Sequence, residues 1–284
     1  MARIYTRKEV IQRLRREIQR GRPIVTAGAG IGLTAKCAEL GGADLIVVYN
    51  SGLFRMHGHG STAGTMPYGD ANQIVLEMGL RTILPVVQET PVIAGICGTD
   101  VTRVMNVFLK QIQEAGFSGV INFPTVGSID GSFRERLEDV GLGFEKEVEM
   151  IRLARAMDLF TMAYVFNPDQ ARLMAKAGVD ALVAHMGLTA GGTIGSKRAK
   201  KLEAVVPLIR EIFRAGKAIR KEMILLAHGG PISSPEDTAY IYRHTEAQGF
   251  VGASSIERIP VEIAIRKVTE EFKSKTLGKK ISRS

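Results

Sequence analysis

Eight short apolar segments alternate with longer amphipathic segments along the chain, and this alternation restricts the possible folds more than any other feature of the sequence. Runs rich in β-branched residues, each followed by a helical pattern, are typical of βα units with parallel strands. Eight such units make a closed (β/α)8 barrel, whereas doubly wound sheets usually have roughly five to seven strands and open edges. The sequence therefore predicts a single TIM barrel of the α/β class. We expect its strands at residues 23–28, 43–50, 91–97, 119–124, 160–166, 180–186, 223–229 and 249–255.

Helical patterns lie between these strands and also before the first one. The helix expected before the first strand, Thr6 to Arg20, carries Val10, Ile11, Leu14 and Ile18 on one stripe. We expect this extra N-terminal helix to pack across the N-terminal end of the barrel. The other helices are expected at about 31–40, 70–84, 101–114, 144–157, 168–177, 199–219, 235–247 and 261–272.

The length and the charge distribution suggest one domain with two basic ends. A chain of 284 residues fits one barrel, which commonly takes about 250 residues. We divide residues 1–284 into a basic N-terminal helix (1–22), the barrel (23–272) and a basic tail (273–284). The first part has eight Lys or Arg against two Glu, and the last has five Lys or Arg and no acid. Such ends could contact nucleic acid through phosphates, although solubilising ends are the commoner use of charge runs.

The composition argues against a membrane protein and against a disulfide-rich secreted protein. Hydrophobic residues make up 45% of the chain and charged residues 24%, and no apolar run approaches the roughly 20 residues that span a membrane. The start, "MARIYTRKEV", lacks the apolar region of a secretory signal, and two cysteines cannot form a disulfide framework. We therefore expect a cytoplasmic protein, and we expect it to form a homo-oligomer.

In a barrel of this type the active site is built from the loops that follow the strands. Four of the five histidines fall on this side of the predicted barrel, namely His57, His59, His185 and His228, whereas His244 falls within the seventh helix. Imidazoles in these positions suit substrate contact or proton transfer near neutral pH. Plain packing is the alternative, and a zinc site is disfavoured because the strands concerned lie on different sides of the barrel.

The segment "YNSGLFRMHGHGSTAGTMPYGDAN" (Tyr49 to Asn72) is expected to be the loop after the second strand. Its five glycines favour movement. We interpret it as a flexible active-site loop in which one histidine, His57 or His59, is catalytic.

Asp100, in "GICGTD" beyond the third strand, is the candidate ligand for a metal ion. Mg²⁺ needs only one or two carboxylates in addition to waters and substrate oxygens. Asp100 is therefore a candidate for both metal binding and catalysis. An N-cap on the third helix is an equally good interpretation, and the two roles are compatible.

The ends of the seventh and eighth strands, "AHGGP" and "GASSIER", predict an anion site. Many barrels bind a phosphate here with backbone N–H groups and a short helix N-terminus. Gly229 and Gly230 would permit close backbone approach, Ser254 and Ser255 could donate hydroxyls, and Arg258 could add charge. Tight packing of small residues at the barrel rim is the alternative.

Polar residues at other strand ends are further candidates for substrate binding. Asn50, Ser51 and Asn122 are the main ones, and Tyr164 and Asn167 are in similar places. They could hydrogen-bond substrate oxygens, and capping or packing is the alternative.

Three other motifs carry weaker signals. "GAGIG" (28–32) lacks the spacing of a dinucleotide loop, and the next strand ends in Asn50 and not in an acid, so we reject that interpretation. "GLTAGGTIG" (187–195) has the make-up of a mobile lid or of a passive surface loop. Cys97 could be a nucleophile, but small cysteines are common in barrel interiors.

Several strings together resemble the phosphoenolpyruvate hydrolase-like family of TIM barrels, which also occurs in a plant protein that inhibits tobamovirus RNA replication. The likeness runs from about Arg3 to Phe272, and its main strings are "GLFRMHGHGSTAGTMPYGDAN", "PVIAGICGTD", "GVINFPTVGSIDG", "AHMGLTAGGTIG", "LLAHGGPIS" and "GFVGASSIERIP". The resemblance implies a link to barrels that act on 2-oxo acids or phosphoenolpyruvate, in which Mg²⁺ stabilises an enolate-like oxyanion. This chain departs from those enzymes because Asp100 stands alone after the third strand.

Two functions follow as hypotheses. In the first, the protein is a hydrolase or lyase that binds phosphoenolpyruvate or a related small anionic acid, with Mg²⁺ at Asp100 and a histidine that transfers a proton. In the second, the barrel binds a ligand, a protein or RNA without catalysis. The basic ends favour the second hypothesis mildly, and the histidines and glycines gathered on one face favour the first.

Overall fold

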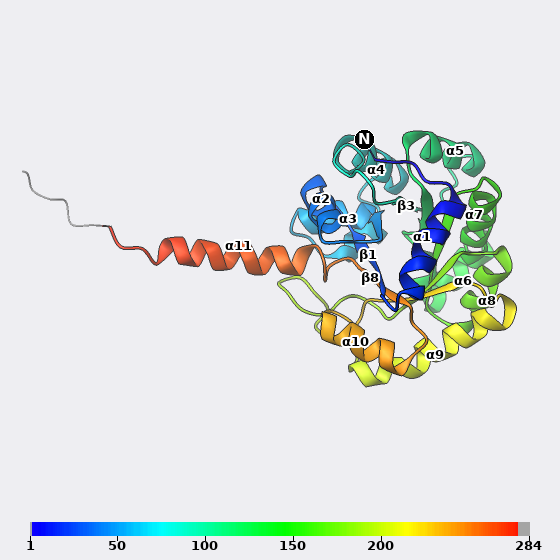
Figure 1. Ribbon diagram of the computed structural model, residues 1–284. Helices are drawn as coiled ribbons and strands as arrows, with labels where there is room; N and C mark the ends of the chain where they lie inside the picture. Colours follow the sequence, from blue (N-terminus) through cyan, green and yellow to red (C-terminus); the bar gives the residue numbers. More distant parts are fainter. Residues whose placement is uncertain (1, 278–284) are drawn as a thin grey trace, which may run out of the picture.

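The computed structural model describes residues 2–277, in which eight parallel strands form a closed barrel in sequence order (Figure 1). Strand β1 pairs with β8 as well as with β2, which closes the sheet. Every strand lies within its predicted range, so the predicted TIM barrel is confirmed. The strands are β1 (Ile24–Gly28), β2 (Leu45–Val48), β3 (Val92–Ile96), β4 (Gly119–Asn122), β5 (Phe160–Val165), β6 (Ala181–His185), β7 (Ile224–His228) and β8 (Gly249–Gly252).

The helices around the barrel are more numerous than the sequence patterns predict. Additional short helices lie in the loops after β2 and β4, where we expect irregular connections. The α-helices of the described part are α1 (Arg7–Gln19), α2 (Gly32–Leu40), α3 (Asn50–Met56), α4 (Ala71–Met78), α5 (Met105–Ala115), α6 (Gly131–Asp139), α7 (Phe144–Ala156), α8 (Pro168–Ala177), α9 (Leu202–Ile219), α10 (Pro235–His244) and α11 (Arg258–Lys273). Shorter helical turns are η1 (Ser61–Thr65), η2 (Gly79–Ile83) and η3 (Val126–Ser128).

Two apolar layers hold the barrel together. The inner layer fills the barrel with side chains such as Leu45, Ile93 and Phe160, and the outer layer lies between the strands and the helices. Strands buried on both faces require nearly continuous apolar runs, which explains why their sequences do not alternate with polar residues. Even α9, which is the longest helix, does not qualify as a membrane span, and none of the helices within residues 2–277 is apolar and long enough to cross a bilayer.

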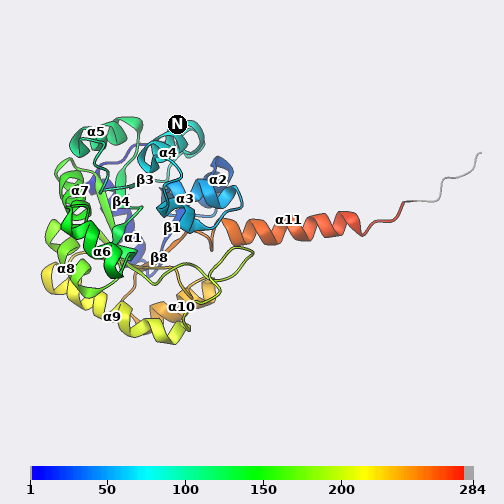
Figure 2. The ribbon, with the colours of Figure 1, turned by 180° about the vertical axis from the view of Figure 1, so that it is seen from behind.

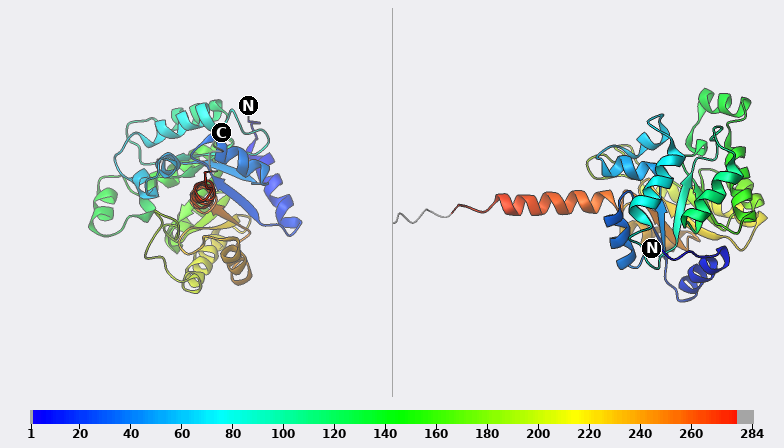
Figure 3. Two further views of the ribbon diagram at one scale, coloured as in Figure 1. Left: turned by 90° about the vertical axis from the view of Figure 1, so that its left-hand side faces the viewer. Right: turned by 90° about the horizontal axis from the view of Figure 1, so that it is seen from above.

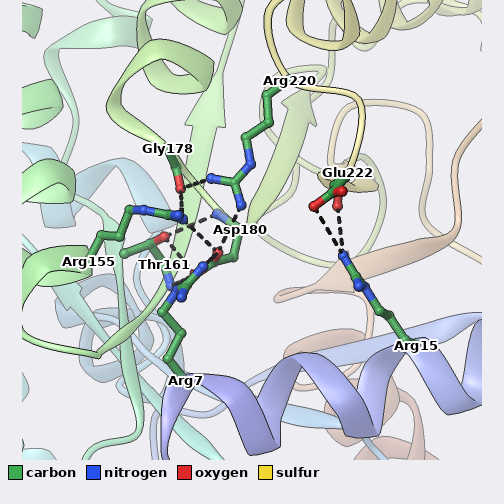
Figure 4. Close-up of polar contacts among 8 residues, drawn as sticks. All are labelled: Arg7, Arg15, Arg155, Thr161, Gly178, Asp180, Arg220 and Glu222. Carbon is green, nitrogen blue, oxygen red and sulfur yellow. Dashed lines mark hydrogen bonds and ion pairs between the residues drawn. The ribbon is translucent and has the colours of Figure 1, made fainter.

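Helix α1 covers the N-terminal end of the barrel, as predicted. Its Val10 and Leu14 are buried in the inner apolar layer. Arg7 forms a bidentate ion pair with Asp180, which immediately precedes β6, with distances of 2.8 Å from Nε to Oδ2 and 2.7 Å from the second nitrogen to Oδ1 (Figure 4). Arg155 lies 3.2 Å from the same carboxylate. Figure 2 shows α1 behind the barrel strands when the molecule is seen from the other side.

Helix α11 extends away from the barrel instead of packing against it. In Figures 1 and 2 it leaves the body between α2 and α10. The right view of Figure 3 shows it projecting from the body, and the left view shows it end-on. The sequence pattern predicts an eighth helix that packs on the barrel, and the structure differs because α11 is exposed from Ile263 to its end. Its apolar residues lie open to solvent, with Ile265 60% and Phe272 77% exposed.

Candidate functional site

A cavity of about 550 Å³ lies at the carboxyl ends of the strands. This is the side on which barrels of this type place their active sites, and it is the side that the sequence predicts. The volume falls within the range of about 300 to 1,000 Å³ that is typical of small-molecule sites. Residues at the ends of six strands contribute to the wall, namely Tyr49, Phe123, Tyr164, His185, His228 and Ser254.

Buried aromatic rings form the deep part of the cavity. The hydroxyls of Tyr49 and Tyr164 lie 2.6 Å apart, although Tyr49 follows β2 and Tyr164 belongs to β5, three strands further round the barrel. Phe123 packs edge-on against both rings, with centroids 5.2 Å from Tyr49 and 6.3 Å from Tyr164. Burial raises the pKa of both tyrosines above its ordinary value. Both phenols are therefore neutral hydrogen-bonding groups at physiological pH.

His185 and His228 stand side by side at the ends of β6 and β7. The register of the two strands pairs these residues directly, and their ring centroids are 4.4 Å apart. Burial lowers the pKa of His228 to about 4. Burial also lowers the pKa of His185 well below its usual value, and the neighbouring His228 acts in the same direction. The two imidazoles are therefore neutral near pH 7.

Backbone contacts give the two imidazoles opposite hydrogen-bonding roles. Nδ1 of His228 lies 2.6 Å from the carbonyl oxygen of Val251, so it must carry the proton and Nε2 is left with a free lone pair. Nδ1 of His185 accepts a 3.0 Å hydrogen bond from the backbone N–H of Gly187, so its proton lies on Nε2. The pair thus provides one hydrogen-bond acceptor and one donor, which general base and oxyanion-stabilising groups require.

A buried ion pair supports one wall of the cavity. Arg55 on α3 donates to Oε2 of Glu257 through Nε at 3.1 Å and Nη2 at 2.9 Å. The other oxygen of Glu257 accepts from the backbone N–H of Gly30. Burial raises the pKa of Glu257, and the charge of Arg55 acts against this shift. The third nitrogen of Arg55, Nη1, faces the hydroxyls of Ser51 and Ser61 at 3.2 and 3.4 Å.

Sequence reasoning missed Arg55 and Glu257. Because α3 is seven residues long and contains Gly52, its helical pattern is weak. The spacing of four residues between Ser51 and Arg55 was the available signal, since it places both on one face of a helix.

A second buried carboxylate, Glu147 on α7, lies behind the cavity. It accepts hydrogen bonds from Asn122 at 2.6 Å, Thr125 at 2.7 Å and the backbone N–H of Val126 at 2.7 Å. Burial raises the pKa of Glu147 to about 7, and the hydrogen bonds from Thr125 and Asn122 oppose the shift. Asn122 also exchanges hydrogen bonds with the backbone of Tyr164. The side-chain amide of Asn122, which we predict to bind substrate, therefore connects β4 with β5 and α7.

The predicted catalytic residues His57 and His59 lie outside the cavity. The segment after β2 folds into α3 and η1, and this differs from the flexible loop that we expect. His57 is the C-cap of α3, and both histidines are exposed to solvent. Neither histidine is among the described residues that line the cavity. A catalytic role for them stays a prediction that this geometry does not support.

Asp100 also lies off the cavity, in a network of its own. Its carboxylate accepts from Thr102 at 2.9 and 2.6 Å, from Asn72 at 2.9 Å and from Arg103 at 2.6 Å. Partial burial acts to raise the pKa of Asp100, but these hydrogen bonds lower it to about 2. The N-cap interpretation is wrong because α5 begins at Met105, with Val104 as its N-cap.

Most of the residues that we predict to bind an anion have other contacts in the structure. Of these five, Ser254 lines the cavity, whereas the hydroxyl of Ser255 is buried without a hydrogen-bond partner among the described residues. Arg258 is the first residue of α11 and pairs with Glu262 of the same helix at 2.6 Å. Gly229 and Gly230 both have positive φ, and the backbone N–H of Gly230 is used by the carbonyl of Gly187 at 2.8 Å. Positive φ and the close approach of the backbone of Met186 and Gly187 account for both glycines as packing residues, and the anion site stays a prediction.

The remaining candidates have mainly structural contacts. Asn50 is buried and donates to the carbonyl of Gly64 at 2.8 Å, and Asn167 is the N-cap of α8. Ser51 lines the cavity beside Arg55. Burial raises the pKa of the Cys97 thiol, which disfavours a thiolate nucleophile.

The glycine-rich segment after β6 contributes to the site. Leu188 and Thr189 line the cavity. The same segment is held at its far end by Thr193, whose backbone N–H and hydroxyl both donate to Glu262 of α11 at 2.8 Å. It therefore connects the cavity to the base of α11.

Comparisons with known sequences relate most of the chain to one family. The model of the phosphoenolpyruvate hydrolase-like family matches residues 9–275. A tomato protein (Solanum lycopersicum), the ToMV susceptible protein tm-1(GCR26), is 53% identical over 266 residues, which are 93% of this chain and 35% of that protein. The chain thus spans about a third of the length of this relative.

Solved structures of similar fold include two enzymes. A phosphoenolpyruvate phosphomutase from Streptomyces platensis subsp. rosaceus superposes with a TM-score of 0.61 at 17% identity, covering 93% of this chain and 86% of that one. A phosphonopyruvate hydrolase in complex with oxalate and Mg²⁺ has a TM-score of 0.59 at 20% identity, covering 93% and 87%. At these identities the likeness shows the fold.

Proposed function

This chain belongs to the phosphoenolpyruvate hydrolase-like family, and on that premise we propose that it is an enzyme acting on a small acid bound in the cavity. The substrate would be phosphoenolpyruvate or a related 2-oxo acid, and the reaction would be hydrolysis or lyase cleavage next to the enolisable carboxylate. The fold shared with a phosphonopyruvate hydrolase supports this class of reaction.

The observation that carries the proposal is the pair formed by His185 and His228. Two neutral imidazoles lie 4.4 Å apart on adjacent strand ends, one with a free Nε2 lone pair and the other with an Nε2–H. A pair that served packing alone would have no need of opposite hydrogen-bonding roles at a cavity wall. General base catalysis of this kind typically contributes a factor of about 10² to 10⁴.

In the proposed reaction, Nε2 of His228 takes a proton from a hydroxyl. In hydrolysis the hydroxyl belongs to water, and in a lyase reaction it belongs to the substrate. In hydrolysis the water oxygen bonds to the atom that is cleaved from the 2-oxo acid, and in a lyase reaction the substrate oxygen becomes a carbonyl oxygen as the carbon–carbon bond breaks. The electron pair of the broken bond passes to the departing 2-oxo acid as its enolate, whose oxygen carries the negative charge, and the proton held by His228 is then returned to the enolate carbon. The Nε2–H of His185 would donate to that oxygen, and Nη1 of Arg55 would bind the carboxylate beside Ser51 and Ser61.

The residues of this chain do not fit a Mg²⁺ site of the kind that the resemblance implies. Asp100 is neutralised by Arg103 and lies outside the cavity. The described residues that line the cavity include no carboxylate. Within residues 2–277 no cluster of three or more His, Cys, Asp or Glu side chains could hold a metal ion. The proposed reaction therefore relies on side chains of the chain and on no protein-bound cation.

Turnover of candidate acids tests the proposal. The intact chain would be incubated with phosphoenolpyruvate and with 2-oxo and 2-hydroxy acids, while phosphate and pyruvate release are followed. His228→Asn keeps a nitrogen that can donate to Val251 and removes the base, so it should lower kcat by about 10² or more. His244→Asn, on α10, is the matched control. Ligand binding without turnover of any acid would instead favour the binding-barrel hypothesis.

We also propose that the chain forms a homo-oligomer in which α11 packs against a second copy. α11 exposes Ile263, Ile265 and Phe272 to solvent. The two helices that flank its exit bury only one residue each among those described, and α2 exposes Leu33 and Leu40. An exposed apolar helix beside poorly covered helices is an arrangement that a second copy could bury.

A further inference from the structure

Three exposed apolar side chains surround the mouth of the cavity. Met66 is 53% exposed, Phe133 59% and Leu188 48%, and all three line the cavity. They come from three separate segments, namely the residue after η1, helix α6 and the loop after β6. Exposed apolar residues that converge on one cavity from distant parts of a chain indicate a ligand with apolar surface.

The charge of the cavity lining also restricts the ligand, because it favours a carboxylate over a phosphate. Among the described residues, its lining contains one charged side chain, Arg55. The charge of Arg55 is compensated by Glu257, whose carboxylate is also buried. A phosphate group carries close to two negative charges near neutral pH and requires several cations or a cluster of N–H donors. A single carboxylate is the better match for a wall of this charge.

One part of the wall is suited to such a carboxylate. Two nitrogens of Arg55 are used by Glu257, and Nη1 lies instead beside the hydroxyls of Ser51 and Ser61, which both line the cavity. These three groups could bind one carboxylate. A three-carbon acid bound there would leave most of a cavity of about 550 Å³ filled with water.

Resting on the proposed function, we infer that the substrate is a 2-oxo or 2-hydroxy acid without phosphate whose side chain is aromatic or branched and apolar. Its carboxylate binds at Arg55, its oxo or hydroxyl oxygen lies at His185 and His228, and its side chain packs among the residues of the mouth, such as Phe133 and Leu188. This specificity distinguishes the chain from enzymes that bind phosphoenolpyruvate itself.

Binding of matched acids to the intact chain tests the inference. Isothermal titration would compare phenylpyruvate, pyruvate and phosphoenolpyruvate as probes. The phenyl group adds on the order of 100 Å² of apolar surface, so phenylpyruvate should bind at least about tenfold more tightly than pyruvate, and more tightly than phosphoenolpyruvate. Leu188→Asp should remove this preference. Leu80→Asp, at an equally exposed apolar position in η2, should leave it unchanged.

The possible results separate this inference from the proposed function. Equal binding of pyruvate and phenylpyruvate, or tighter binding of phosphoenolpyruvate, would overturn the inference and leave the proposed function in place. Retention of the phenyl preference in Leu188→Asp would also overturn it, because the side chain would then lie elsewhere. If none of the three acids bound, the proposed function would fail as well.

Discussion

Nη2 of Arg55 lies 2.9 Å from Oε2 of Glu257, and both residues are almost fully buried. The pair joins α3, which follows β2, to the beginning of α11, which follows β8. Because Glu257 also accepts from the backbone of Gly30, three segments at the carboxyl ends of the strands are connected at one carboxylate. The position of the cavity wall at Arg55 and Ser51 therefore depends on this contact.

Removal of one partner of this pair should be strongly destabilising. In Glu257→Gln the charge of Arg55 is left buried without compensation, and we expect a loss of about 3 to 5 kcal/mol in the free energy of unfolding. Urea denaturation monitored by circular dichroism would measure it. Arg152→Met, which breaks the exposed pair with Glu149, is the control and should cost less than about 1 kcal/mol. Similar losses in the two variants would contradict the assigned importance of the pair.

The dependence of activity on pH should reflect the low pKa of His228. Since burial lowers this pKa to about 4, the imidazole stays unprotonated, and active as a base, well below the usual pKa of about 6.5. We expect kcat/KM to be nearly constant from pH 8 to pH 5 and to fall by half near pH 4. Circular dichroism at each pH would verify that the protein remains folded. Half-loss of activity near pH 6.5 would exclude His228 as the base.

The same pKa shift should make folding stability fall in acid. Between pH 6.5 and pH 4 the unfolded chain binds a proton at His228 that the folded chain excludes. Stability is therefore fully present above pH 6.5 and is lost as the pH falls toward 4, by up to about 3 kcal/mol. His228→Asn should show a smaller loss over this range. Urea midpoints at pH 7 and pH 4.5 would be compared, and an identical decrease in both proteins would rule out this contribution.

Exposure of α11 leads to a prediction about assembly. The charged double variant Ile265→Asp/Phe272→Asp should convert the expected homo-oligomer into a monomer, because the apolar surface of α11 could no longer be buried against a second copy. Light scattering coupled to gel filtration would give the masses. Val140→Asp introduces the same charge at another exposed apolar position and should not change the mass. A parent chain that is already monomeric would refute the proposed contact.

Chelation should have no effect on turnover. Because the cavity lining of the described chain contains no carboxylate and Asp100 is occupied by Arg103, we expect the same kcat with Mg²⁺ and with EDTA. Asp100→Asn should likewise change kcat by less than about twofold, which separates it from His228→Asn. An EDTA-sensitive activity that Mg²⁺ restores would show that the substrate or unexpected residues bind the ion.

The barrel was predictable from the sequence because each strand is a continuous apolar run and each such run is followed by a helical pattern. The positions of His185 and His228 at strand ends followed directly. Arg55 and Glu257 could not be paired in this way, because they are 202 residues apart and the short α3 has little helical signal. The position of α11 away from the barrel could not be predicted either. Its apolar pattern is what a packed eighth helix would show, and only the three-dimensional arrangement reveals that it lies in solvent.

The inner apolar layer fills the barrel and is completed by α1, so the cavity can be reached only from the carboxyl ends of the strands. Val10 and Leu14 close the N-terminal side, whereas the cavity opens at the other side beside Met66 and Leu188. A substrate would therefore enter, and its products would leave, through the same mouth of the cavity. If the reaction produces two fragments, the fragment at the mouth would have to leave before the fragment bound at Arg55. The products would therefore be released in a fixed order.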